Sequence, residues 1–188
     1  MGMRDVVVRP YAQTDRDDVL AIFDANRADY FGTGDRDWLI ETLDEPDGPA
    51  FVVAVDGRAA AFGGYEVWEH YNKALLYWGM AAPAWHGCGL GRLLLLARLH
   101  HVAVHARLVT RYVTVDTSPR VAPFFLRCGF EQTAVWPEGY RSGMTMHELR
   151  FDLAKVSAEA LAARRDDALS KVALLLSSSG REDRGPRT

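Results

Sequence analysis

The chain has 188 residues, 48% of them hydrophobic, and a formal net charge of −3. Its length is typical of one domain with one core, and its charge argues against a nucleic-acid-binding surface. No apolar run approaches the roughly 20 residues that cross a bilayer, and the N-terminal Met1–Asp5 lacks the hydrophobic segment of a signal peptide. Cys88 and Cys128 have no metal-ligating spacing and indicate a reducing compartment. We therefore expect a cytoplasmic protein without a metal, a nucleic-acid partner or a membrane partner.

The first half of the chain predicts a strand, two helices and a β-hairpin. Apolar residues recur at helical spacing in two segments, which Gly32-Thr33-Gly34 separates. The dipeptide Asp56-Gly57 is a strong signal for a hairpin turn. The expected elements are a strand at 6–10, a helix capped by Thr14 that ends near 29, a helix at 35–44 with Trp38, Leu39 and Leu43 inward, and strands at 51–55 and 59–70.

The second half alternates strands with helices. An apolar strand that Pro83 stops precedes a glycine-rich loop and a leucine-rich helix. A pair of helices, an antiparallel meander and then a β-α-β unit predict a mixed α/β fold. The expected elements are strands at 75–83 and 112–116, helices at 89–106 and 121–128, and strands near 131–135 and 144–153.

The C-terminal segment predicts one more helix. Ser157–Leu176 is rich in alanine and leucine. We expect it to pack on its own domain or on a second copy of the chain in a homodimer. The expected organisation is a domain over 4–153, a helix over 154–177 and a disordered tail over 178–188. The apolar residues at helical intervals are Leu161, Ala168, Leu169, Val172 and Leu176.

Three glycines on alternate positions, Gly87, Gly89 and Gly91, precede the leucine-rich helix. A helix N-terminus has unpaired N–H groups and a partial positive charge, and glycines let an anion approach the backbone closely. The spacing differs from the G-x-G-x-x-G dinucleotide fingerprint, and no Gly-Lys-Ser/Thr of a P-loop follows. The loop is therefore predicted to hold a pyrophosphate, and a dinucleotide-binding enzyme is disfavoured.

Three segments in order resemble the GNAT-type N-acetyltransferases. His86-x-x-Gly89-x-Gly91 is similar to the family's acetyl-CoA loop, Gln/Arg-x-x-Gly-x-Gly/Ala, with histidine in the first position. Leu75–Pro83 resembles the central strand, and Thr117–Phe130 resembles the Asn…Ala…Phe-Tyr-x-x-x-Gly-Phe segment. The resemblance covers about residues 4–153. It implies a mostly antiparallel central sheet flanked by helices, with acetyl-CoA as co-substrate.

The resemblance also implies an acyltransferase that moves an acetyl group to a primary amine of a small molecule or protein, directly within a ternary complex. A main-chain N–H between Met80 and Ala82 would polarise the thioester carbonyl. Phe125 stands where the family has a tyrosine that protonates the thiolate, so the remaining routes are Ser118 through water or an unprotonated thiolate. The implied cofactor contacts are Met80, Ala81, Ala82, His86, Gly87, Cys88, Gly89, Leu90, Gly91, Arg92, Ser118 and Phe125. We expect Gly89→Glu to abolish CoA binding and leave the fold nearly intact.

The base is less defined, because residues 74–79 carry no carboxylate or histidine. Glu66 is the preferred candidate, since it shares a strand face with Gly64 and Trp68; the alternative is an ordinary solvated residue. His101 and His105 are spaced to share a metal, but a solvent-facing pair is the favoured interpretation. The candidate acceptor-binding residues are Asn26, Tyr30, Phe31, Trp68 and Tyr77. Tyr30 and Phe31 are equally interpretable as core aromatics, and packing is the favoured interpretation for Tyr77.

The absent tyrosine leaves a second function class open. An acyl-CoA-binding module or sensor of the same fold, without turnover, also explains Phe125 and the strand without a base. The acceptor is not defined by sequence: amines, aminoglycosides, amino acids and peptides all remain candidates.

Overall fold

The computed structural model describes residues 4–140 and 143–178. Its centre is a seven-stranded sheet in the order β1-β2-β3-β4-β5-β7-β6. All neighbouring strands are antiparallel except β4 and β5, which run parallel. The predicted mixed, mostly antiparallel sheet is thereby confirmed. The strands are β1 (Val6–Pro10), β2 (Ala50–Val55), β3 (Arg58–Trp68), β4 (Lys73–Ala81), β5 (Tyr112–Thr117), β6 (Glu131–Trp136) and β7 (Met146–Asp152).

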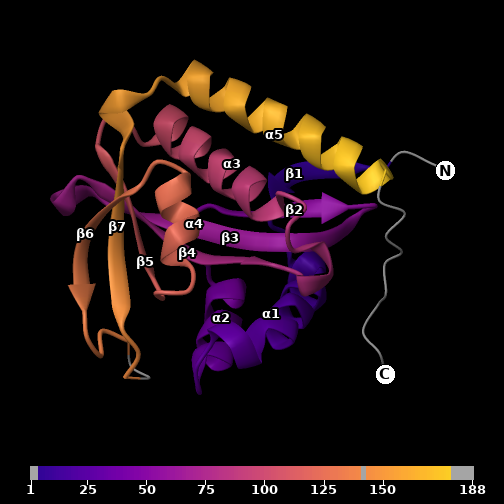
Figure 1. The fold of residues 1–188 in the computed structure, drawn as a ribbon, viewed down its shortest axis with the longest axis horizontal. Coiled ribbons are helices and arrows are strands. Elements are labelled where there is room, and N and C mark those ends of the chain that lie inside the picture. The colour runs from indigo at the N-terminus through magenta and orange to yellow at the C-terminus, as the bar shows by residue number, and fades with distance from the viewer. Residues whose placement is uncertain (1–3, 141–142, 179–188) are drawn as a thin grey trace.

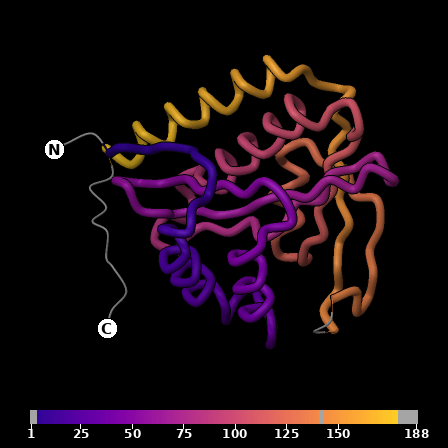
Figure 2. The backbone as a smooth tube through the Cα atoms, turned by 180° about the vertical axis from the view of Figure 1, so that it is seen from behind, coloured from indigo at the N-terminus to yellow at the C-terminus, as the bar shows by residue number. Residues whose placement is uncertain are grey.

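Helices cover both faces of this sheet (Figure 1). One face carries α1 and α2, and the other carries α3, with α5 lying across the outside of α3; Figure 2 shows the same order of layers from behind. Within the described residues, no helix is long and apolar enough to cross a membrane. The helices are α1 (Arg16–Tyr30), α2 (Asp35–Asp44), α3 (Leu90–His105), α4 (Ala122–Arg127) and α5 (Ala158–Ser178).

The sheet separates two hydrophobic cores. The larger one packs α3, α4 and α5 against the sheet, with Leu93, Leu95 and Val102 of α3 fully buried. The smaller one packs α1 and α2 on the other face, around Phe23 and Phe62. Because alternate residues of a strand point to opposite faces, β2, β3 and β4 contribute to both cores. Leu76, the last residue of β4 that pairs with β5, belongs to the larger core, and Met80 farther along β4 belongs to the smaller one.

Most predicted elements form, and three local expectations are wrong. Thr14 does not cap α1, since a short 3-10 turn precedes the helix and the Asp15 carboxylate accepts from the Ala12 N–H instead. Trp38 is 58% exposed rather than inward. Its ring packs against the ring of Trp78 and remains open to solvent elsewhere. Ser178 is helical, so α5 runs into the segment expected to be disordered. The rest of that expected tail, 179–188, lies outside the described residues.

The hairpin prediction is confirmed by its turn. Asp56 and Gly57 have φ values of 51° and 83°, so both central residues adopt positive φ, as a type I′ turn requires. The carboxylate of Asp56 also accepts from the Asp5 N–H at 3.0 Å and pairs with Arg4. The turn therefore fixes β2 and β3 and also fastens the start of β1 to them.

Asp15 links β1 to the start of α1, and its protonation should govern part of the acid stability. Its carboxylate accepts from the two terminal nitrogens of Arg9 at 2.6 and 2.7 Å. The bonds from Arg9 hold the pKa of Asp15 below its ordinary value, although burial opposes them. We expect Asp15→Asn to lower the free energy of unfolding by about 1–3 kcal/mol at neutral pH.

The same pKa shift predicts how that difference depends on pH. Because the folded-state pKa is the lower one, the stabilisation is complete above the unfolded-state value of about 3.9 and disappears as pH falls through the folded-state value. Urea denaturation of wild type and Asp15→Asn at neutral pH and at about pH 2.5 measures this loss. A difference of equal size at both pH values would contradict the assignment.

Candidate active site

The sheet opens between β4 and β5. Only Lys73–Leu76 of β4 pair with Tyr112–Val115 of β5, and β4 then continues alone on that side to Ala81. The Ala82 N–H donates to Ala60 O at 2.8 Å, toward β3. Because N–H groups alternate along a strand, the Ala81 N–H points toward the open side. Within the expected range Met80–Ala82, the Ala82 amide is therefore already bonded, and Ala81 supplies the edge donor.

A β-bulge shapes this open edge. The β3–β4 register shifts between Phe62 and Gly64, and Trp78 has a φ of 48°, in the left-handed region that non-glycine residues rarely adopt. Its ring lies 6.1 Å from Phe23 and 4.9 Å from Trp38, and its Nε1 donates to Thr42 Oγ1 at 3.0 Å. Helices α1 and α2 thus hold the strained residue in place, and Gly79 is left exposed on the edge.

The glycine loop presents backbone N–H groups at the end of that edge. Gly87 and Gly89 have φ values of 79° and 89°, and α3 begins at Leu90. Across residues 4–140 and 143–178, neither glycine N–H donates to a protein acceptor, and the first-turn N–H groups of α3 have no intrahelical partner. A Cβ at Gly87 would have no atom within 4 Å. The loop therefore has both the donors and the space for an anionic ligand.

Several residues expected at the cofactor can reach it through the backbone only. The side chains of Met80, Cys88 and Leu90 are buried. His86 and Asn26 each place a side-chain nitrogen 2.9 Å from Ala81 O. Their polar groups therefore hold the end of β4 against the loop and α1, and a contact of either with a ligand stays a prediction.

Helix α4 forms the other wall near the start of α3. Phe125 is 5% exposed, with ring centroids 5.1 Å from Phe124 and 5.2 Å from Phe130. Phe124 lies 3.8 Å from the position of a Cβ on Gly91. Ser118, just beyond β5, is half-buried and its carbonyl accepts from Val121 and Ala122 at the start of α4. An aromatic wall thus stands where the family resemblance implies a phenolic hydroxyl.

Glu66, the expected base, lies on the face of the sheet that α1 and α2 cover. Glu66 accepts a hydrogen bond from Trp68 Nε1, which confirms that the two share a face. The Tyr77 hydroxyl donates to Gly48 O at 3.2 Å. Burial raises the pKa of Tyr77, and Asp47 and Glu66 add to the effect, so Tyr77 stays protonated at neutral pH. Tyr77 is therefore both a packing residue and a neighbour of Glu66.

Two further polar residues on this side were missed from sequence. Burial raises the pKa of Asp116 on β5, with Glu148 of β7 adding to it. Burial also raises the pKa of Tyr140, in the β6–β7 connection, and the charges of Asp116 and Asp35 reinforce the effect. Period-2 alternation against the buried Val113 and Val115 places Asp116 on this face. The approach of Tyr140 leaves no comparable signal.

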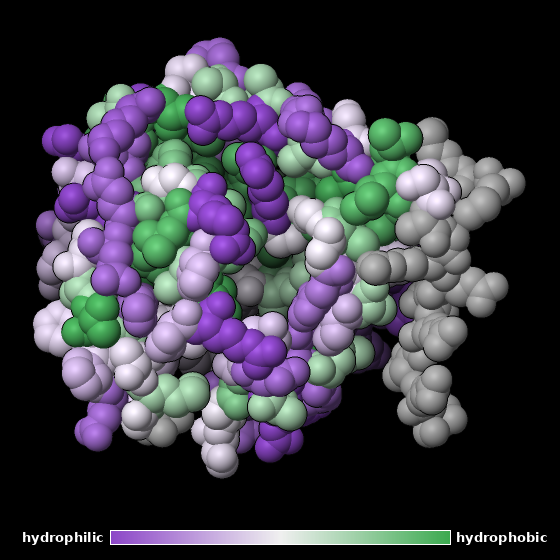
Figure 3. Space-filling view, viewed as in Figure 1, coloured by the Kyte–Doolittle hydropathy of each residue, from purple (hydrophilic) through white to green (hydrophobic). Residues whose placement is uncertain are grey.

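The end of α1 closes the same region. Phe31 stacks on Phe23 at 4.5 Å, so it is a core residue. Tyr30 lies under Arg120, whose guanidinium carbon is 4.6 Å from the ring centroid, and Arg120 pairs with Asp29 at 3.1 Å. In Figure 3, a hollow rimmed by hydrophilic side chains lies near the centre of the face, beside the position of α4 in Figure 1.

The histidine pair on α3 is only partly the solvent-facing pair expected, since His105 is exposed and His101 is not. His101 is half-buried, with its Nδ1 2.7 Å from the Tyr65 hydroxyl and its ring 4.2 Å from that of His105. Packing against β3 explains the difference. Within the described part of the chain, no group of three or more His, Cys, Asp and Glu side chains is arranged to hold a metal ion.

A split β4–β5 sheet with an amide-rich loop at its open edge defines an acyltransferase of the acyl-CoA-dependent class. A family model described as the acetyltransferase (GNAT) family matches residues 19–130. That is more than half of the chain, so the protein belongs to the GNAT acetyltransferase family. No curated protein matches the sequence significantly.

Solved structures share the fold. A protein assigned to the GNAT family from Desulfovibrio desulfuricans is 25% identical, with a TM-score of 0.67 over 79% of this chain and 99% of its own. YncA from Salmonella typhimurium, solved with acetyl-CoA, is 18% identical, with a TM-score of 0.61 over 79% and 94%. The ribosomal-protein-S18-alanine N-acetyltransferase from Escherichia coli is 16% identical, with a TM-score of 0.64 over 79% and 94%.

Proposed function

We propose that this protein transfers the acetyl group of acetyl-CoA to a primary amine of a small molecule or protein, directly within a ternary complex. The observation that carries the proposal is the departure of β4 from β5 after Leu76, with unbonded loop amides at the end of the same edge. Acetyl-CoA supplies an activated acetyl thioester. The N–H groups of Gly87, Gly89 and Gly91 bind its diphosphate, and the Ala81 N–H bonds the thioester oxygen.

Side chains supply the remaining diphosphate contact, the base and the acid. Arg92, in the first turn of α3, adds a positive charge beside the diphosphate. The candidate bases for the amine are Glu66 and Asp116, which lie on the face of the sheet that α1 and α2 cover. Ser118 is the candidate acid, through water, because Phe125 has no proton to give. A thiol of pKa about 8.5 is also an acceptable leaving group as the thiolate.

Amine acceptors of very different size occur among proteins of this fold. Solved neighbours include a spermidine N-acetyltransferase and an aminoglycoside 6′-N-acetyltransferase in complex with coenzyme A, besides the ribosomal-protein enzyme. A primary amine is the common acceptor chemistry we carry to this chain. We also propose a cytoplasmic location, and a catalytic domain over 4–153 that α5 completes.

Two measurements test the function. Calorimetry with CoA and acetyl-CoA measures binding, and a thiol reagent then follows CoA release from acetyl-CoA in the presence of a panel of amines. Reactions without an acceptor correct for the protein's own cysteines, Cys88 and Cys128. Release above that background supports the proposal, and failure to bind either ligand overturns it. Binding with no release for any acceptor favours the acyl-CoA-binding module, for which the phenylalanine at 125 is the specific argument.

Glu66→Gln should lower kcat/KM with the best acceptor by about 100-fold, because general-base catalysis contributes roughly 100- to 10,000-fold. The acid side of the pH profile should also move, since the group that must lose its proton has gone. Asp116→Asn is the matched comparison, because it makes the same chemical change on β5. If Asp116→Asn moves the profile and Glu66→Gln does not, Asp116 is the base.

A further inference from the structure

Arg98, in the middle of α3, is a cation in the larger core. It is 2% exposed. Its Nη1 donates to Gly64 O and to Tyr77 O, both at 3.3 Å, while its buried Nε has no hydrogen-bond partner among the described residues. Burial lowers the pKa of Arg98 to about 10, which still leaves it charged at neutral pH. The core thus contains a permanent positive charge.

No acidic side chain neutralises that charge. Across the described ranges, no carboxylate forms an ion pair with Arg98, and the Tyr77 hydroxyl is the titratable group that acts on it. An unpaired buried charge is costly, and hydrophobic residues of similar volume are often neutral or stabilising in its place. Leu94, Leu95 and Leu99 occupy neighbouring buried positions of the same helix. Stability alone therefore does not explain an arginine here.

Two glycines of the sheet, Gly63 and Gly79, leave the space that the Arg98 side chain occupies. A Cβ on Gly63 would lie 2.9 Å from Nη1, and a Cβ on Gly79 would lie 3.1 Å from Nη2. Gly63 stands opposite Trp78 and Gly79 in the bulge. The guanidinium therefore fills the gap that the bulge opens between β3 and β4, and it bonds to a carbonyl of each strand beside that gap.

The charge lies directly behind the open edge. Gly79 is exposed on the side of β4 that β5 has left, whereas the guanidinium is packed against Gly79 from the α3 side. Neighbouring strands lie about 4.8 Å apart, so a thioester in the opening lies within about two strand spacings of the guanidinium. Charges act strongly over such distances where water is excluded.

We propose that Arg98 is a positioning residue for acetyl transfer, one that fixes the β4 bulge and places an uncompensated positive charge behind the sulfur of the thioester. In the reaction the amine nitrogen bonds to the acetyl carbon, the carbon–sulfur bond breaks, the amine proton passes to the base, and the sulfur keeps the bonding electrons. The positive charge of Arg98 stabilises that sulfur anion. The inference rests on the proposed function, since it needs CoA in the β4–β5 opening.

The ionisation of bound CoA tests this without knowledge of the acceptor. The ultraviolet absorbance of the thiolate is titrated with pH for CoA bound to wild type, to Arg98→Met and to Arg98→Lys, with each protein alone subtracted to remove its own cysteines. We expect wild type to bind CoA with a thiol pKa below the ordinary value of about 8.5. Arg98→Met should raise that pKa by about one unit, and Arg98→Lys, which keeps the charge, should retain most of the lowering.

Calorimetry and thermal unfolding on the same variants separate this role from a structural one. We expect CoA affinity to change less than about threefold, and kcat with the best acceptor to fall about tenfold at unchanged KM. If Arg98→Met does not fold, Arg98→Gln, which keeps hydrogen-bond donors without the charge, replaces it. An identical thiol pKa in wild type and the uncharged variant overturns the role of Arg98 and leaves the function standing. Failure of wild type to bind CoA overturns the function itself.

Discussion

Replacing Gly91 by glutamate is expected to weaken CoA binding at least about 100-fold while the protein stays folded. The new carboxylate would stand in the first turn of α3, among the N–H groups that we assign to the diphosphate. Repulsion between like charges and the lost approach of the phosphates to the backbone act in the same direction. Calorimetry with CoA measures the loss, and circular dichroism with a thermal melt verifies the fold.

Gly91→Ala is the matched control. A Cβ at this position lies 3.8 Å from the Phe124 ring, an ordinary contact, and Gly91 has no positive φ. We therefore expect alanine to preserve the fold and most of the affinity. Equal CoA affinity in Gly91→Glu and Gly91→Ala would contradict the placement of the diphosphate.

Gly89 is not suited to this test, contrary to the expectation from sequence. Its φ of +89° strains any side chain, and a Cβ would lie 3.2 Å from Val172 of α5. Gly89→Glu would therefore disturb the packing of α5 on α3 as well as the loop. That contact joins residues far apart in the sequence, so no local pattern reveals it.

The parts of the site that sequence could predict are those set by local chemistry. Alternate glycines before a leucine-rich run predict the loop because the helix N-terminus and the close backbone approach are properties of a few consecutive residues. The strand before Pro83 is equally local. Helix α2 forms over Asp35–Asp44 as predicted, since Gly34 and the apolar spacing define it without help from the rest of the chain.

The rest of the site depends on contacts between distant segments. His86 occupies a ligand position in the family pattern, yet its ring nitrogen lies against Ala81 O. Tyr140 lies near enough to Asp116 for that charge to raise its pKa, although the two residues are distant in the sequence. Arg98 did leave a signal, since a charge interrupts the apolar stripe of α3, but only the bulge in β4 explains where its guanidinium lies.

Position 125 and Arg98 both bear on how the sulfur of CoA leaves. A tyrosine is absent at position 125, and the phenylalanine there is enclosed by Phe124 and Phe130. A site without an acid can still release a thiolate if positive charge stabilises it. Arg98 supplies such a charge from the opposite side of β4. In this proposal the buried arginine therefore compensates for the missing tyrosine.

Helix α5 is expected to be an integral part of the domain, and Leu161→Ala should show it. Leu161 is fully buried, within the core that α3 shares with the sheet. Removing its three outer carbons leaves a cavity, which lowers the free energy of unfolding by about 3 kcal/mol. For a chain of this length the melting temperature should then fall by about 6–12 °C.

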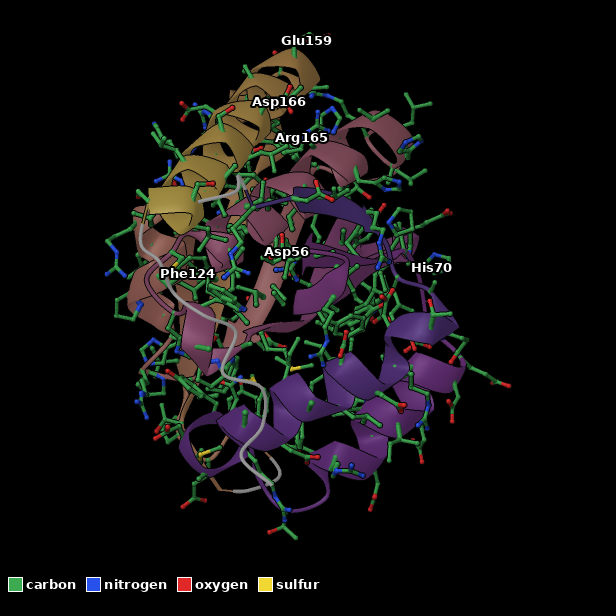
Figure 4. The ribbon with its side chains drawn as sticks, turned by 90° about the vertical axis from the view of Figure 1, so that its right-hand side faces the viewer. Asp56, His70, Phe124, Glu159, Arg165 and Asp166 are labelled. Carbon is green, nitrogen blue, oxygen red and sulfur yellow. The ribbon has the colours of Figure 1, made fainter. Side chains whose placement is uncertain are left out.

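Leu174→Ala makes the same change on the solvent side of the same helix, where the residue is 72% exposed. Glu159 and Asp166 mark this outer surface in Figure 4, on the side away from the sheet. We expect Leu174→Ala to alter stability by less than about 0.5 kcal/mol. Differential scanning calorimetry of the two variants compares them directly. Because alanine replaces leucine in both, helix propensity cancels, and equal melting temperatures would show that α5 folds apart from the sheet and α3.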